Sequence, residues 1–196
     1  MNREKPNPQF RAMLLALLLI TSPTTAFSYN WPQFNGDPSH SGNNTREKTI
    51  GANNVGGLKM LFKVRLPAVT DGAPVYVASV KTSRGPRDLV YVTTKEGHLV
   101  ALDAKTGAGV WSFGHPARGC KINRGEISCL STSSPAVDPN LKYVYSYGLD
   151  GYVHKHRTGD GKEVESGGWP QPATLKPFDE KGSSALSIAT ARNGTS

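Results

Sequence analysis

The chain has 196 residues, of which 37% are hydrophobic and 19% charged, and it contains 21 glycines and 14 prolines. So many glycines and prolines exclude a helical bundle and suit a protein with many short turns, because both residues interrupt helices. The formal net charge of +8 is modest, and no basic stretch with interleaved aromatic residues accompanies it, so we expect no nucleic-acid partner.

The first 26 residues have the organisation of a secretory signal peptide. Three basic residues precede a nine-residue apolar run at 12–20, and small residues follow it up to a cleavage point after Ala26 or Ser28. The alternative is an uncleaved anchor, but this run falls well short of the roughly 20 apolar residues that a spanning helix needs. We therefore expect a signal peptide at 1–26, no membrane span, and a secreted or periplasmic protein.

The chain has two cysteines, Cys120 and Cys129, and both follow the leader. In an oxidising compartment, two thiols in one short glycine-containing loop most simply form a local disulfide. A metal site would require further cysteines or histidines at ligand spacing, and a redox pair is normally spaced Cys-x-x-Cys. We therefore expect a structural disulfide between these two residues.

Two stretches of the chain, 54 residues apart, share one plan of short strands and tight turns. In the first, β-rich runs at 89–94 and 98–103 are joined by a Glu-Gly turn, and a Thr-Gly turn leads into a third run. Apolar residues alternate within the run at 98–103, which indicates a strand and not a helix. A run rich in Pro, Ser and small residues precedes each stretch, and a third such run begins at residue 183. Four short strands in about 50 residues are typical of a β-propeller blade.

The first stretch contains the pattern Ala-Leu-Asp-x-x-Thr-Gly-x-x-x-Trp, whose defining residues are Asp103, Thr106, Gly107 and Trp111. This pattern resembles the repeat of pyrroloquinoline-quinone (PQQ) type β-propellers. The resemblance implies that the Trp packs between neighbouring blades, and that the Asp and the Thr-Gly close the turn between the third and fourth strands. In the second stretch the positions of Asp, Thr and Trp are occupied by Arg157, Asp160 and Glu165. The motif is structural and does not itself indicate catalysis.

We therefore expect an all-β fold, a β-propeller of PQQ-like repeats with about three four-stranded blades present and an incomplete ring. Because a closed propeller needs roughly four to eight blades, the chain has the features of a fragment. The expected organisation is a signal peptide, then a lead-in at 27–57 and a partial propeller at 58–196. The expected blades cover approximately 71–115, 133–168 and, incompletely, 183–196.

His154 and His156 lie two residues apart on an expected strand, so their side chains point to one face, as two metal ligands would. No carboxylate or cysteine stands at an obvious partner spacing, and blade strands often carry solvent-facing polar residues. We therefore expect no metal site. The neighbouring Lys142, Lys155 and Arg157 could attract an anion, but such a cluster is more typical of a solvated face.

Two classes of function fit a PQQ-like propeller, and the sequence leaves open whether the protein is an enzyme. The resemblance implies, as one class, a PQQ-dependent alcohol dehydrogenase, an oxidoreductase that holds PQQ and Ca²⁺ and in many members has two adjacent cysteines. Cys120 and Cys129 are separated, and no residue can be assigned to catalysis or to the cofactor by motif. The other class is a noncatalytic propeller that offers its faces to a protein or polysaccharide partner. We expect this binding or scaffold propeller, with the dehydrogenase as the alternative.

Overall fold

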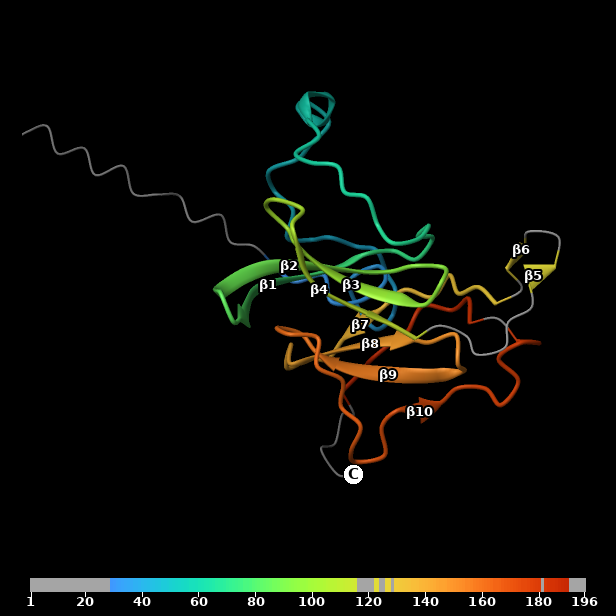
Figure 1. Ribbon diagram of the computed structural model, residues 1–196. Coiled ribbons are helices and arrows are strands. Elements are labelled where there is room, and N and C mark those ends of the chain that lie inside the picture. Colours follow the sequence, from blue (N-terminus) through green and yellow to red (C-terminus); the bar gives the residue numbers. More distant parts are fainter. Residues whose placement is uncertain (1–28, 116–121, 124–125, 128, 181, 191–196) are drawn as a thin grey trace, which may run out of the picture.

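The computed structural model describes residues 29–115, 122–123, 126–127, 129–180 and 182–190 and consists almost entirely of β-structure. Two antiparallel sheets of four strands form its body (Figure 1). The strands of the first sheet are, in spatial order, β1 (Val75–Thr82), β2 (Gly85–Thr93), β3 (His98–Asp103) and β4 (Gly109–Gly114). The strands of the second sheet are β7 (Ala136–Val137), β8 (Tyr143–Tyr147), β9 (Tyr152–Arg157) and β10 (Gln171–Pro172). The remaining elements are a hairpin of β5 (Ile122–Asn123) and β6 (Glu126–Ile127) and a short 3₁₀ helix (Val55–Gly57).

These sheets confirm the expected all-β fold with an open ring of four-stranded units. The alternation predicted for the first repeat produces a regular ladder, in which Leu89 lies opposite Asp103 and Tyr91 opposite Ala101. The ladder between β1 and β2 is interrupted after Val77 by a bulge. At the bulge Ser79 has a positive φ of 54°.

The hydrophobic core lies between the two sheets, which are stacked face to face in Figure 1. The first sheet contributes most of the core, and the second contributes Val137 and Val144, which are 2% and 0% exposed. Trp111 of β4 is partly buried and packs against this cluster. Burial of these apolar side chains between the sheets holds the two repeat units together.

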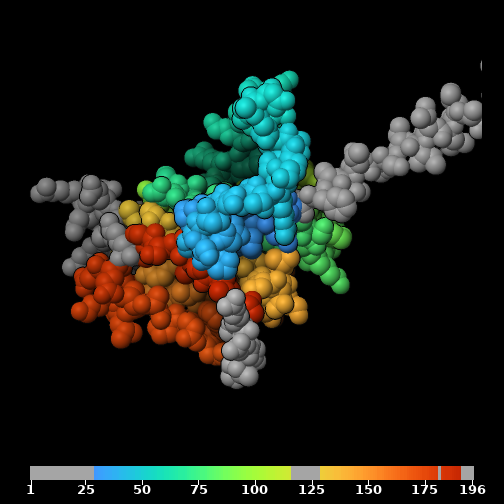
Figure 2. Space-filling view, turned by 180° about the vertical axis from the view of Figure 1, so that it is seen from behind, coloured from blue at the N-terminus to red at the C-terminus, as the bar shows by residue number. Residues whose placement is uncertain are grey.

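The lead-in hydrogen-bonds to both sheets and to a later segment of the chain. Trp31 exchanges two backbone hydrogen bonds with Tyr76 of β1, and the carbonyl of Pro32 accepts one from the N–H of Val137 in β7. The side chain of Gln33 hydrogen-bonds with both the N–H and the carbonyl of Ile188. Figure 2 shows this blue N-terminal segment lying against the later parts of the chain. Residues 31–33 therefore connect β1, β7 and the segment around Ile188.

Two predictions concern residues outside the described ones. The signal peptide at 1–26 lies outside them entirely. Cys120 also does, whereas Cys129 is described and 2% exposed. No cysteine in the described ranges is free, and the pairing of the two stays a prediction. No helix within the described ranges is long and apolar enough to cross a membrane.

Candidate functional site

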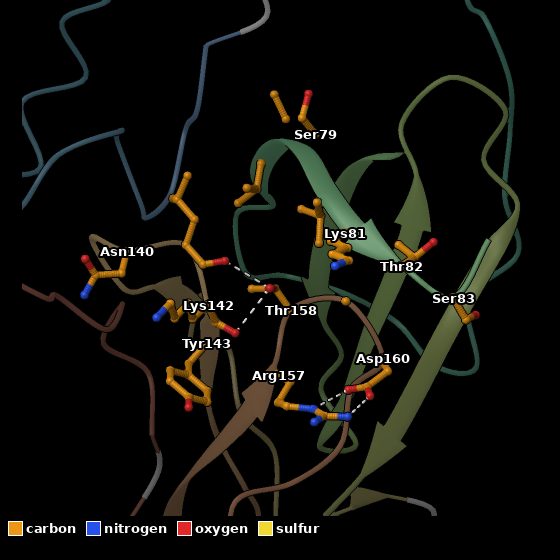
Figure 3. A pocket seen from close by; sticks show the side chains of 15 residues that line it. Ser79, Lys81, Thr82, Ser83, Asn140, Lys142, Tyr143, Arg157, Thr158 and Asp160 are labelled. Atoms are coloured by element: carbon orange, nitrogen blue, oxygen red, sulfur yellow. Dashed lines mark hydrogen bonds and ion pairs between the residues drawn. The ribbon is translucent and has the colours of Figure 1, made fainter. Parts of the chain in front are cut away.

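A cleft of about 820 Å³ opens between the two sheets, at the end where their connecting turns lie (Figure 3). One wall is formed by residues 77–83, which are the second half of β1 and the turn after it. The other wall is formed by residues 140–143, at the start of β8, and by residues 157–160, at the end of β9. The cleft is thus built by the turns of two neighbouring repeat units.

The charged residues that line the cleft are mostly basic. Lys81 and Lys142 are exposed on opposite walls, and neither forms an ion pair with a described residue. Arg157 pairs with Asp160 through both carboxylate oxygens, with its Nε 2.9 Å from Oδ1. The hydrogen bond from the guanidinium lowers the pKa of Asp160, so this carboxylate is ionised and already neutralised. The two lysines therefore leave the cleft with a positive field.

Thr158 fixes the position of the wall that contains β9. Its hydroxyl donates to the carbonyl of Leu141 at 3.0 Å, which joins the two turns of the second sheet. Its own carbonyl accepts two hydrogen bonds from the first sheet, from the Tyr91 hydroxyl at 3.1 Å and from Trp111 Nε1 at 2.9 Å. The cleft is therefore anchored to both sheets by hydrogen bonds that are buried or partly buried.

The motif residues of the first repeat lie at the turn between β3 and β4. Asp103 Oδ1 accepts hydrogen bonds from the backbone N–H and the hydroxyl of Thr106, each at 3.0 Å. Its other oxygen lies 2.8 Å from Arg87 Nη1. The Thr106 hydroxyl is the main reason that the pKa of Asp103 is lowered. Gly107 has a φ of +73°, and a Cβ there would lie 2.6 Å from Phe62 Cδ2, so both its backbone and its packing require glycine.

Trp111 lies between the two sheets. Its ring stacks on His156 of β9 with the centroids 6.4 Å apart, and a Cβ at Gly161 would lie 2.6 Å from it. Together with the hydrogen bond from Nε1 to Thr158, these contacts place the indole between one repeat unit and the next.

The corresponding turn of the second repeat has the same backbone hydrogen bond as the first, but different side chains stabilise it. The N–H of Gly161 donates to the carbonyl of Arg157 at 2.9 Å, as the N–H of Gly107 does to Asp103 at 2.8 Å. The Arg157–Asp160 ion pair stands where the first repeat has its Asp–Thr hydrogen bond.

In the second repeat the indole lies four residues beyond the motif position, which Glu165 occupies. Glu165 is exposed, and Trp169 instead packs on Tyr145, with the ring centroids 5.0 Å apart. This pair repeats the packing of Trp111 on Tyr91, whose centroids are 5.7 Å apart. Four extra residues displace the tryptophan along the chain, so the fourth strand, β10, falls at Gln171–Pro172 and beyond the expected blade end at 168.

The expectation that His154 and His156 face solvent is also wrong. They are 3% and 0% exposed, because this face of β9 packs against the first sheet. Lys155 points to the opposite face, where its Nζ lies 4.1 Å from the ring centroid of Tyr143.

Carboxylates accompany the histidines, contrary to the expectation from spacing. His154 Nδ1 lies 2.5 Å from Glu163 Oε1, and its Nε2 lies 3.0 Å from Asp150 Oδ1. His115, which follows β4, stacks on His154 with the centroids 3.4 Å apart. Burial lowers the pKa of His115 to about 4 and also lowers that of His156, so both rings are neutral at physiological pH.

Comparison with known proteins identifies the family. Residues 31–166 match the family described as "PQQ: Glucose/ethanol/alcohol dehydrogenase, beta-propeller domain". The chain belongs to this family. The match confirms the resemblance to PQQ-like propellers that the repeat motif indicated. No curated protein matches the chain.

Two solved structures are similar to parts of the chain. A europium-containing methanol dehydrogenase shares 19% identity at a TM-score of 0.34, over 69% of this chain and 31% of that one. BamB from Moraxella catarrhalis shares 20% identity at a TM-score of 0.18, over 50% of this chain and 43% of that one. The chain thus spans less than half the length of either protein.

The family description raises the question of whether the described residues fit PQQ and its Ca²⁺. A pocket of about 490 Å³ is lined by residues of four segments, namely 34, 71–73, 132 and 134, and 183 and 185. Its one carboxylate in the described lining is Asp71, which lies 3.2 Å from Lys95 Nζ. Ca²⁺ takes six to eight oxygen ligands, several of them usually carboxylates. The described lining of this pocket therefore does not fit a Ca²⁺-bound quinone.

Proposed function

We propose that this chain is part of an exported, noncatalytic PQQ-like propeller, and that the cleft between its two sheets binds an acidic segment of a protein partner. The observation that carries the proposal is the pair of unpaired lysines, Lys81 and Lys142, on opposite walls of this cleft. Its volume of about 820 Å³ is within the usual range for ligand pockets.

The charges of the lining favour an anionic ligand. Three cations and one carboxylate line the cleft, and the carboxylate of Asp160 is neutralised by Arg157. A bound carboxylate could therefore interact with either lysine without competing with a protein anion. Positive clefts of this kind attract acidic partners during the encounter and fix their register.

The same lining disfavours catalysis in this cleft. Asp160 is the one carboxylate among the described lining residues, and its two oxygens are held by the Arg157 guanidinium. A carboxylate in such a bidentate pair is a poor general base, because the guanidinium stabilises its ionised form. The described lining also contains no histidine and no cysteine.

A protein partner fits the cleft better than a polysaccharide. Sugar rings are commonly recognised by stacking on open aromatic faces, and Tyr143 is the one aromatic side chain in the described lining. The ammonium of Lys155 lies 4.1 Å from the Tyr143 ring centroid and already occupies that ring by a cation–π contact. Extended carboxylate side chains need no such platform.

Binding of a fluorescein-labelled oligoglutamate peptide to the full chain tests the proposal. The double variant Lys81→Glu/Lys142→Glu should bind at least about tenfold more weakly, because it removes two attractive charges and adds two repulsive ones. The matched control Lys59→Glu/Lys176→Glu changes the same charge at exposed positions outside the cleft and should retain most of the affinity. Equal losses in both variants, or binding of an oligogalacturonate in preference to the peptide, would overturn the proposal.

The family description names dehydrogenases, which keeps a PQQ-dependent alcohol dehydrogenase as the second candidate. Dye-coupled oxidation of a panel of alcohols by the full chain with added PQQ and Ca²⁺ separates the two. We expect no turnover, since the described lining of the 490 Å³ pocket has a single carboxylate, which is ion-paired. PQQ-dependent turnover would refute the noncatalytic proposal. Export is tested by N-terminal sequencing of the mature protein, which should begin after Ala26 or Ser28.

A further inference from the structure

A cluster of three histidines and two carboxylates lies between the two sheets, away from the lining of the basic cleft. His115 follows β4 of the first sheet, and the other members, Asp150, His154, His156 and Glu163, belong to the second repeat. The side chains of His115 and Glu163 are 12% and 17% exposed, and His156 is fully buried. Elements that are distant in the sequence therefore bring several potential metal ligands together in one largely buried cluster.

Three of these side chains aim their ligand atoms at a common point. The Nε2 atoms of His115 and His156 lie 3.1 Å apart, and Glu163 Oε2 lies 3.9 Å from His115 Nε2. All three ligand atoms lie within 4.8 Å of one another. Zinc binds nitrogen and oxygen at about 2.0–2.2 Å in a tetrahedron, which separates neighbouring ligand atoms by roughly 3.3–3.5 Å. The distance between the two Nε2 atoms is slightly shorter than this value, and the distance from His115 Nε2 to Glu163 Oε2 is slightly longer.

Surrounding groups orient two of the three ligands. His156 Nδ1 lies 2.9 Å from the carbonyl oxygen of Gly161. Because that carbonyl can only accept, Nδ1 carries the proton and Nε2 presents its lone pair to the centre of the cluster. His154 Nδ1 holds Glu163 Oε1 at 2.5 Å and leaves Oε2 toward His115. Such outer contacts are typical of the groups that position metal ligands.

We infer that His115, His156 and Glu163 form a binding site for a divalent transition-metal ion, with Zn²⁺ as the metal that its donors suit best. Two imidazole nitrogens and one carboxylate oxygen are a donor set that zinc uses with three protein ligands. His115 comes from the first repeat and the other two ligands from the second. The bound ion therefore joins neighbouring blades. This site is independent of the proposed peptide-binding cleft, since none of its ligands lines that cleft.

Metal titration of the full chain, produced without a histidine tag and stripped with EDTA, tests the inference. Calorimetry with ZnCl₂ should show one ion per chain, and the thermal unfolding temperature should rise on addition of zinc. Glu163→Gln keeps the shape of the side chain but removes the anionic ligand, and should weaken zinc binding on the order of 10–100-fold or more. His115→Gln should do the same. The control His98→Gln removes a histidine of β3 outside the cluster and should bind zinc like the parent chain.

X-ray absorption at the zinc edge decides the matter independently of how well the variants fold. Two imidazole ligands and oxygen donors around the bound zinc would support the site. Thiolate ligation, or a shell without imidazole, would overturn it by assigning the metal to other residues. The inference also fails if the stripped chain binds no zinc, or if folded Glu163→Gln and His115→Gln chains bind it as tightly as the His98→Gln control.

Discussion

The two hydrogen bonds that converge on the Thr158 carbonyl provide a quantitative test of how the two sheets are joined. Tyr91 Oη donates to this oxygen at 3.1 Å and Trp111 Nε1 donates at 2.9 Å. Burial raises the pKa of Tyr91, so its hydroxyl remains a donor at any ordinary pH. The carbonyl belongs to the second repeat unit and both donors to the first, so the two bonds act across the boundary between blades.

Removal of both donors should cost more than the sum of the single losses. Tyr91→Phe removes one hydrogen bond, worth about 1 kcal/mol, and Trp111→Phe removes the other together with part of the packing of the indole ring. In either single variant the remaining donor still satisfies the Thr158 carbonyl. The double variant leaves a buried carbonyl without a donor, which costs about 1–3 kcal/mol in its own right. We therefore expect a coupling of about 1–2 kcal/mol in the free energy of unfolding, with the double variant less stable than additivity predicts.

Urea unfolding of the four chains, followed by circular dichroism, measures this coupling. Intrinsic fluorescence is unsuitable because one variant removes a tryptophan. The control cycle pairs Trp111→Phe with Tyr143→Phe, whose hydroxyl makes no hydrogen bond to Thr158. The control should be additive within about 0.5 kcal/mol. Additivity of the Tyr91 cycle within the same margin would refute the claim that the Thr158 carbonyl depends on these two donors.

Three further predictions concern the turns and the cysteines. Gly161→Ala should lower the free energy of unfolding by about 1–3 kcal/mol, because its φ is +69° and its Cβ would lie 2.6 Å from the indole ring; unchanged urea midpoints would contradict this packing. The hydrogen bond from Thr106 lowers the pKa of Asp103 in the folded chain. The ionised carboxylate therefore stabilises the fold fully at a pH above its pKa in the unfolded chain, and this stabilisation is lost as the pH falls through its pKa in the folded chain. Asp103→Asn should therefore unfold at a lower temperature at neutral pH and lose less stability on acidification; parallel pH profiles would argue against it. Non-reducing mass spectrometry should find Cys120 and Cys129 bridged, with reduction costing about 2–3 kcal/mol, and two free thiols would exclude the bridge.

The repeat unit could be read from the sequence because its signals are local. The alternation in β3 and the glycine that a left-handed turn requires at Gly107 depend only on near neighbours in the chain. The spacing of 54 residues between the two stretches then indicated a propeller, which the family match and the two sheets confirm.

The packing position of Trp169 could not be predicted from local sequence signals. Alignment by constant spacing selected Glu165, whereas the chain accommodates four extra residues before Trp169 packs on Tyr145. An insertion at a surface turn costs little backbone energy. The position of the ring is therefore decided by the aromatic surface that it covers, and not by the count of residues.

The tertiary structure alone decided what the histidines face. Their spacing in the sequence predicts only that His154 and His156 lie on one side of a strand, and it identifies no side chain that contacts them. Packing of the second sheet on the first buries both histidines. It also brings His115, which precedes His154 by 39 positions, close to Glu163. The basic cleft arises in the same way, from turns of two units that meet only when the sheets stack. Sequence periodicity determines each sheet because its ladder is local, whereas these sites depend on how one sheet is placed against the next, which no short-range pattern encodes.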